Sequence, residues 1–381
     1  MVGETHMSEK NIYEATKIKL SEVLGEENLR KLSPYIHVYD GSEKSVKPVA
    51  KTITIYYIAR AADRLTIRTE GEDDIILSTI GDSAVPTIIF RKMKAIYLRE
   101  FMKLARLQWE RLSENIRKVW YGDIDFITKC SLTVGIAGAE TGKGKGAMHG
   151  RCMKCPVDVL MGATSATVNY NLVSRFVGDS AYALTSSYER LTGNAVDEIT
   201  YTTIMLTSAR QTEEERRTGG LYYMTFVPPG TLFVGKFVLF MPSPPELLYS
   251  LWLLTKTVRV GARTSIQGTL EVYPVAIIGD LNECGSAYEA SEKAFGLREI
   301  EKVRGKLLEY IGSKLYSTSS FIEITQDILS KLQKLDILDN KLVSELWLNA
   351  KNYIDGVTKY IGVSPTKSTT EAGEERVKSK K

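Results

Sequence analysis

The alternation of hydrophobic and polar residues predicts strands in the first quarter of the chain and a long helix after them. Between residues 49 and 90, β-branched residues alternate with polar ones between turn-forming residues, a pattern typical of three or four strands of a meander. Between residues 91 and 120 the spacing changes to that of an amphipathic helix. The apolar face of this predicted helix comprises Phe101, Leu104, Ala105, Leu112, Ile116 and Val119.

The remainder of the chain continues as a mixture of strands and helices. Ser243 and Glu246 have the spacing of a capping box, with prolines between them, and predict a helix that runs to about Lys256. A helix is also predicted from Ile12 to Leu24. Strand-like stretches lie at 166–184, 197–208, 221–240 and 265–279, and the pattern at 286–360 is mostly helical. These elements predict an α+β protein, and the polar, charged residues 364–381 predict a disordered tail.

The composition is that of a folded globular protein, with 43% hydrophobic and 25% charged residues in 381. No apolar run reaches the roughly 18–20 residues that a membrane span needs, because Lys236, Glu246 and several prolines interrupt the most apolar stretch. The polar N-terminus lacks the layout of a signal peptide. Four cysteines do not make a disulfide framework in a chain of this length, which favours a reducing cytoplasm.

A histidine and cysteine cluster in the sequence HGRCMKCP, residues 149–156, predicts a metal site. Cys152 and Cys155 form a C-x-x-C pair, and His149 and Cys130 would complete the Cys₃His shell that structural zinc commonly takes. Cys284 is an alternative to Cys130, and the alternative to a metal site is two unpaired thiols beside a surface imidazole. A closed shell leaves no position for a reacting water, so the expected role of the zinc is structural.

Familiar catalytic motifs do not account for this chain. The loop GAETGKGKG resembles a phosphate-binding loop, but the first glycine and the final serine or threonine of that motif are replaced by Ala137 and Gly144. The acidic stretch 71–74 is typical of a solvated hairpin turn. The serines and histidines form neither a G-x-S-x-G nor an H-E-x-x-H arrangement. We therefore predict a protein that is not an enzyme.

Positive charge is gathered at three turns or loops, although the net charge is only +4. The clusters comprise Arg91, Lys92 and Lys94; Lys143, Lys145, Arg151 and Lys154; and Lys256, Arg259 and Arg263 around Gly261. Three such clusters suit a groove that follows a phosphate chain, and the 20 tyrosines and 10 phenylalanines offer stacking partners for bases. For Arg99, Lys103, Arg106 and Arg117 on the predicted helix, a solvated face is an equally good explanation.

Five short motifs occur in an order that resembles one known family. They are FRKMK at 90–94, the HGRCMKCP cluster, NAVDE at 194–198, VPPGTLF at 227–233 and VRVGARTSIQG at 258–268. In this order they resemble the backbone subunit of type I-D CRISPR effector (Cascade) complexes, in the repeat-associated RAMP superfamily. The resemblance extends from about residue 35 to 285.

This resemblance implies a modified RRM (ferredoxin-like) core, an antiparallel sheet with helices, carrying a zinc-containing lid and a thumb hairpin. The implied core spans 35–285, with the lid at about 120–165 and the thumb at about 194–232. An N-terminal helical segment (1–34), a C-terminal helical region (286–363) and the tail (364–381) would flank the core.

The resemblance also implies a function. Several copies would bind one CRISPR RNA without reading its sequence, together with other Cascade subunits, and present its bases to target DNA. The RNA-binding residues that it implies are Arg91, Lys92, Lys94, Arg175, Gly261 and Arg263, and the zinc ligands are Cys130, His149, Cys152 and Cys155. The charge clusters add Lys143, Lys145, Arg151, Lys154 and Arg259 to the predicted RNA-binding set. Two alternatives stay open: metal-dependent cleavage of the target strand, with Asp123 or Asp125 or acids of the thumb as candidates, and a zinc-stabilised nucleic-acid-binding protein unrelated to CRISPR.

Overall fold

The computed structural model describes the chain in several segments, which cover residues 12–67, 75–122, 127, 130, 151–164, 170–186, 202–205, 221–224, 226–260 and 268–362. Its strands are β1 (Thr52–Ala61), β2 (Leu77–Ile80), β3 (Ser83–Ile88), β4 (Phe176–Gly178), β5 (Ala181–Ala183), β6 (Thr202–Met205), β7 (Leu221–Met224), β8 (Leu232–Phe240), β9 (Val258–Arg259), β10 (Thr269–Asp280) and β11 (Ser320–Glu323). Its α-helices are α1 (Glu14–Leu24), α2 (Glu26–Leu32), α3 (Phe90–Arg111), α4 (Glu114–Tyr121), α6 (Pro156–Met161), α9 (Pro244–Leu254), α10 (Ala287–Ala294), α11 (Ile300–Lys314), α12 (Gln326–Lys334) and α13 (Asn340–Tyr360). This mixture confirms the predicted α+β class.

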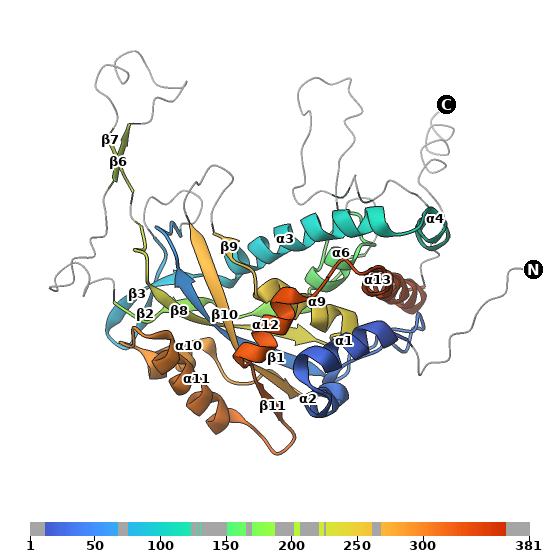
Figure 1. Ribbon diagram of the computed structural model, residues 1–381. Coiled ribbons are helices and arrows are strands. Elements are labelled where there is room, and N and C mark those ends of the chain that lie inside the picture. The colour runs from blue at the N-terminus through green and yellow to red at the C-terminus, as the bar shows by residue number, and fades with distance from the viewer. Residues whose placement is uncertain are drawn as a thin grey trace, which may run out of the picture.

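An antiparallel sheet forms the centre of the molecule (Figure 1). Its strands follow the order β11-β10-β1-β8-β5-β3-β2, with β4 paired to β8 and β9 paired to β10. The longest strands, β1, β8 and β10, lie side by side and are almost wholly buried, which explains their rich content of β-branched and aromatic residues. β6 and β7 form a separate two-stranded hairpin within the segment where the thumb is predicted.

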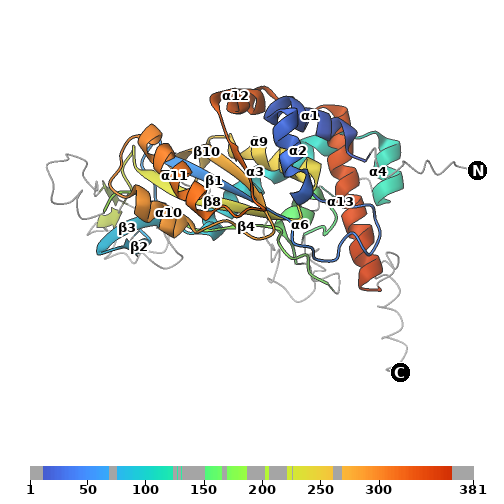
Figure 2. The same cartoon turned by 90° about the horizontal axis from the view of Figure 1, so that it is seen from below.

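Helices cover both faces of the sheet (Figure 2). α10 and α11 pack on one face, over Tyr56, Ile58 and Ala276 of the central strands. On the other face, the largest core cluster joins residues of β1, β8 and β10 to α1, α3, α9, α12 and α13. The N-terminal and C-terminal helices thus share a core with the strands between them.

The predicted helix at 91–120 is two helices. Ser113 caps α4 by accepting a hydrogen bond from the backbone N–H of Ile116, and Leu112 before it is extended. This break changes the direction of the apolar face. Phe101 and Leu112 are buried as predicted, but Val119 is 70% exposed, so its assignment to the apolar face was wrong.

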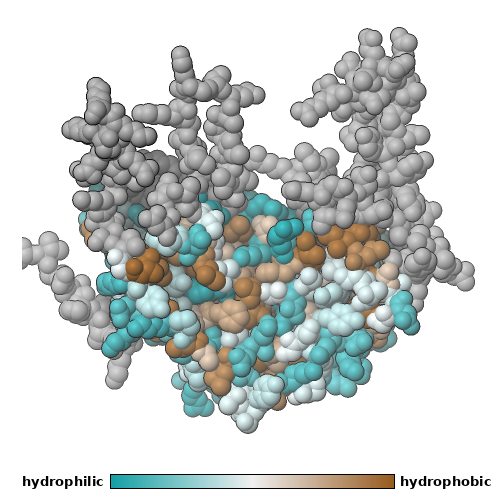
Figure 3. All heavy atoms as spheres, turned by 180° about the vertical axis from the view of Figure 1, so that it is seen from behind, coloured by the Kyte–Doolittle hydropathy of each residue, from teal (hydrophilic) through white to brown (hydrophobic). Residues whose placement is uncertain are grey.

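The C-terminal region contains one strand, β11, among its helices, and none of the described helices is long and apolar enough to span a bilayer. Seen from behind, the described surface mixes hydrophilic and hydrophobic side chains rather than separating them (Figure 3).

Candidate metal centre and phosphate-binding face

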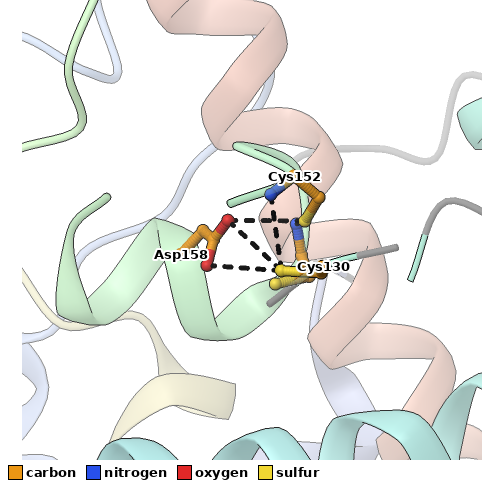
Figure 4. Close-up of side chains that lie close together, drawn as sticks. Cys130, Cys152 and Asp158 are labelled. Carbon is orange, nitrogen blue, oxygen red and sulfur yellow. Dashed lines mark hydrogen bonds between the residues drawn. The ribbon is translucent and has the colours of Figure 1, made fainter. Parts of the chain in front are cut away.

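Four side chains from two separate segments converge at one buried point. The sulfurs of Cys130, Cys152 and Cys155 and a carboxylate oxygen of Asp158 all lie within 4.8 Å of one another. Figure 4 shows Cys130 and Cys152 facing Asp158, which projects from α6. Among the described residues, this is the one group of three or more histidine, cysteine, aspartate or glutamate side chains that could hold a metal ion.

Local backbone geometry explains how the three cysteines meet. The N–H groups of Cys152 and Cys155 donate to the sulfurs of Cys130 and Cys152, each over 3.3 Å. Met153, between the paired cysteines, has a positive φ of 59°, which turns the chain tightly enough for both thiols to face the same point. Pro156 then begins α6 with a preset φ, and this helix carries Asp158 in its first turn.

The cluster holds more potential negative charge than positive charge. Arg151 pairs with Asp158 at 2.5 Å, and the Met153 N–H donates to the same carboxylate at 2.8 Å. Burial and the hydrogen bond with Cys130 raise the pKa of the Cys152 thiol, while burial and the Cys130 charge raise the pKa of Asp158. A cation bound among the four groups would offset the repulsion between their ionised forms, so the donor set fits a divalent metal such as zinc.

The described group contains three of the four predicted ligands, Cys130, Cys152 and Cys155. His149 lies outside the described residues, and the described fourth side chain is Asp158. The alternative ligand Cys284 is wrong, since that residue packs against the α10–α11 face with Tyr56 and Tyr310. Sequence reasoning missed Asp158 because an acid in the first turn of a helix is ordinary; its position three residues after Cys155 was the available signal.

The first turn of α3 carries an unusual charge pattern. Ile89 occupies the N-cap and makes no side-chain cap, and the turn contains Arg91 and Lys92 but no acid. Positive side chains are unfavourable at a helix N-terminus, because the exposed N–H groups there already carry partial positive charge. Arg91 is exposed and Lys92 is half-buried. The Phe90 N–H at this end donates to the Ser180 hydroxyl at 3.4 Å, so the positive charge of the turn itself is what would favour an anion here.

α3 also connects this turn to the surroundings of the four-residue metal group. The Lys94 amine donates to the Ser174 hydroxyl at 2.7 Å, and burial together with the neighbouring Arg151 charge lowers the pKa of Lys94. Further along the helix, Arg106 donates to the backbone carbonyl of Cys130 at 2.9 Å. The two predicted clusters around Lys94 and Arg151 are therefore neighbours in space.

A second cationic position lies where β9 pairs with β10. Arg259 is exposed on β9, opposite Thr269. Lys256, just before β9, lies over the ring of Trp252 with its amine 4.0 Å from the ring centroid. A cation held over an aromatic face is positioned while it stays partly open to solvent.

Two of the predicted RNA-binding arginines face inward. Arg175 is 7% exposed, donates to both carboxylate oxygens of Glu246 and lies between the rings of Tyr39 and Tyr353. The Arg151 side chain is 9% exposed and pairs with Asp158. Because a buried, paired guanidinium has no face left for a phosphate, the geometry of Arg175 and Arg151 argues against RNA binding by either side chain. Lys154, in contrast, is exposed.

Several predicted residues lie outside the described part of the chain. They are Lys143, Lys145, Gly261 and Arg263 of the cationic clusters, and Asp123 and Asp125, the candidate acids for cleavage.

Comparison with known proteins assigns the chain to a family. A family model described as Csc2 Crispr matches residues 31–360. The fold is similar to the crystal structure of Thermofilum pendens Csc2, with a TM-score of 0.60 and 20% identity over 86% of this chain and 94% of that one. No protein with a curated description matches the chain.

Two weaker similarities are to chains of larger assemblies. A chain of a CRISPR RNA-guided surveillance complex, pre-nicking, gives a TM-score of 0.41 with 11% identity, over 68% of this chain and 86% of that one. A chain of a type IV-B CRISPR complex gives 0.33 with 12% identity, over 58% and 90%. The family model covers most of the sequence and agrees with the resemblance to Cascade backbone subunits, so the chain belongs to the Csc2 CRISPR family.

Proposed function

We propose that this protein is the repeating backbone subunit of a type I-D CRISPR interference complex and binds CRISPR RNA without sequence preference. Membership of the Csc2 CRISPR family supports this role, and a cytoplasmic location follows from it. Copies of the chain would line up along one RNA beside other Cascade subunits, and base pairing with the target DNA would supply the specificity.

The observation that carries the proposal is the first turn of α3. Arg91 and Lys92 stand in a first turn that contains no acid and whose N-cap residue, Ile89, gives no side-chain cap, and Lys94 follows them and donates to the Ser174 hydroxyl. A phosphate bound there would accept from the Arg91 and Lys92 side chains, and the positive end of the helix dipole would favour it. Arg259 and Lys154 are further exposed cations of the proposed set, and Lys143, Lys145, Gly261 and Arg263 complete it.

We also propose zinc as the metal held by Cys130, Cys152 and Cys155, with either the predicted His149 or Asp158 as the fourth ligand. Three thiolates select a soft or borderline cation, and a closed four-ligand set serves structure rather than catalysis. α3 touches this centre through Arg106 and reaches the cationic turn at its other end. The metal would therefore hold one wall of the RNA-binding face in place.

Charge reversal tests the RNA-binding proposal. Arg91→Glu with Lys92→Glu should weaken binding of single-stranded RNAs of unrelated sequence about tenfold or more, and to a similar degree for each RNA, because backbone contacts carry no sequence information. Fluorescence anisotropy at low salt measures the affinities. The matched control is Lys302→Glu with Lys306→Glu on α11, which changes the charge equally at two exposed ion-paired lysines. Equal weakening by both pairs would contradict a localised site.

Metal content tests the zinc proposal separately. Native mass spectrometry of the purified protein should show one zinc ion per chain, and Cys152→Ser should lose it and unfold at a lower temperature. Metal binding in zinc-finger peptides stabilises folding by about 10–16 kcal/mol, so the effect of its loss should be large. The control is Cys284→Ser, which leaves the cluster intact. Protein without bound metal and with the stability of the Cys152→Ser variant would refute the assignment.

A further inference from the structure

Asp63 ties the end of β1 to the beginning of β10. Its Oδ1 accepts the backbone N–H groups of Gly268 and Thr269, each at 2.6 Å, and its Oδ2 accepts the Thr269 hydroxyl at 2.8 Å. The neighbouring Ala62 N–H donates to the Thr269 carbonyl at 2.9 Å. The side chain of Asp63 is half-buried. Thr269 is therefore held from the β1 side by both its backbone and its side chain.

The partner strand β9 depends on this anchoring. Within the described part of the chain, Val258 and Arg259 of β9 pair with Leu270 and Thr269 of β10, and a two-residue ladder is marginal on its own. Beyond the ladder, the Val260 N–H donates to the Gly268 carbonyl at 2.8 Å. Gly268 has a φ of +107°, and a Cβ there would lie 2.2 Å from the Val260 carbonyl oxygen. The backbones of β9 and β10 therefore approach each other so closely at Gly268 that only glycine fits there.

We propose that Asp63 is a positioning residue for the cationic end of β9. It holds Thr269, the residue paired with Arg259, and so fixes the strand from which that arginine projects. This inference rests on the proposed RNA binding by Arg259. By charge alone, a carboxylate near a phosphate-binding face would weaken binding. Asp63 accepts three hydrogen bonds, which explains why an acid stands at this place. Because these bonds hold Thr269, removing Asp63 should weaken RNA binding instead of strengthening it.

Two substitutions of Asp63 separate geometry from charge. Asp63→Ala removes both the hydrogen bonds and the charge, and should weaken binding of single-stranded RNA roughly five- to tenfold. Asp63→Asn removes the charge but keeps an Oδ1 that accepts both N–H groups, so most of the affinity should return. The control is Asp82→Ala, which removes an exposed acid in the turn between β2 and β3. Arg259→Ala should weaken binding and lower the salt slope by about 0.7.

Each outcome decides the proposal. If Asp63→Ala and Asp63→Asn both bind RNA more tightly than the original protein, Asp63 acts by repulsion and the positioning role is wrong. If Arg259→Ala weakens binding but Asp63→Ala does not, positioning is also wrong although the proposed function stands. If the original protein binds no RNA, the proposed function fails. Hydrogen exchange at Gly268 and Thr269 without RNA then decides the anchoring itself, which predicts faster exchange in Asp63→Ala than in Asp63→Asn.

Discussion

At the scale of single residues, the buried pair Arg175 and Glu246 connects parts of the chain that are far apart in sequence. Arg175 precedes β4, Glu246 lies in the first turn of α9, and Asn349 of α13 donates to the same carboxylate at 3.1 Å. Although burial opposes it, the Arg175 guanidinium holds the pKa of Glu246 below its usual value. The pair therefore remains charged in the core, where losing either member leaves the other without compensation.

Arg175→Met should reduce the free energy of unfolding by about 3–5 kcal/mol, because it leaves the Glu246 carboxylate buried and unpaired. The double variant Arg175→Met with Glu246→Gln should recover a large part of this loss, since neither substituted side chain carries a charge. Urea unfolding followed by circular dichroism measures both. A single variant within 1 kcal/mol of the original protein would show that the pair contributes little.

His37 makes the stability depend on pH in a defined direction. Its Nε2 donates to the Ser45 carbonyl at 2.7 Å, and burial lowers the pKa of the imidazole below its value of about 6.5 in an unfolded chain. The unfolded state therefore binds a proton more readily than the folded state. Stability should be unaffected by this group above pH 6.5, and should be lost as the pH falls from 6.5 through the folded pKa.

The His37→Gln variant tests this direction, because glutamine can donate to the same carbonyl but does not titrate. Thermal unfolding between pH 7.5 and 5 should show a steeper loss of stability in the original protein than in the variant. Parallel curves for the two proteins would mean that His37 titrates alike in both states.

At the scale of elements, α1 is capped by a residue from the other end of the chain. Tyr13 precedes the helix with a positive φ and gives no side-chain cap, while the Glu345 carboxylate of α13 accepts the N–H groups of Ala15 and Thr16, each at 2.8 Å. Two orphan donors and the positive end of the helix are thus satisfied across the core. The N-terminal helix should depend on α13 for its stability.

Glu345→Ala should lower the free energy of unfolding by about 1–2 kcal/mol, the usual effect of losing a helix cap. Urea unfolding provides the value, and Glu301→Ala, at an exposed glutamate of α11, serves as the comparison. The account of this cap fails if the two variants are equally stable.

Elements with local signals were predictable from the sequence. The capping box of α9 is present, with the Ser243 hydroxyl accepting from Glu246 and the Glu246 side chain accepting from Ser243. The break at Leu112 was not predicted, because the apolar spacing continues through Ser113 and only the cap reveals a second helix.

The candidate site was predictable only in part. The C-x-x-C motif identified two cysteines, whereas Asp158 comes close to them because of the way α6 folds back. The burial of Arg175 could not be read from sequence, since its partner Glu246 lies 71 residues away.

At the scale of the whole molecule, one long helix connects the two features on which the proposed function rests. α3 begins at the turn that carries Arg91 and Lys92, and Lys94 in this region contacts Ser174. Near its other end, Arg106 contacts the backbone carbonyl of Cys130, a member of the metal group. The helix packs on the same core cluster as the central strands. A phosphate chain bound at this turn would therefore be held by a rigid part of the fold.

The salt dependence of RNA binding tests the central claim most directly. For two single-stranded RNAs of equal length and unrelated sequence, log Kd should rise linearly with log salt concentration, with the same slope for both and about 0.7 per neutralised phosphate. Affinities at each salt concentration should agree within a few-fold. Binding that ignores salt, or that strongly prefers one of the two sequences, would contradict an account in which cations of this fold hold the RNA by its backbone.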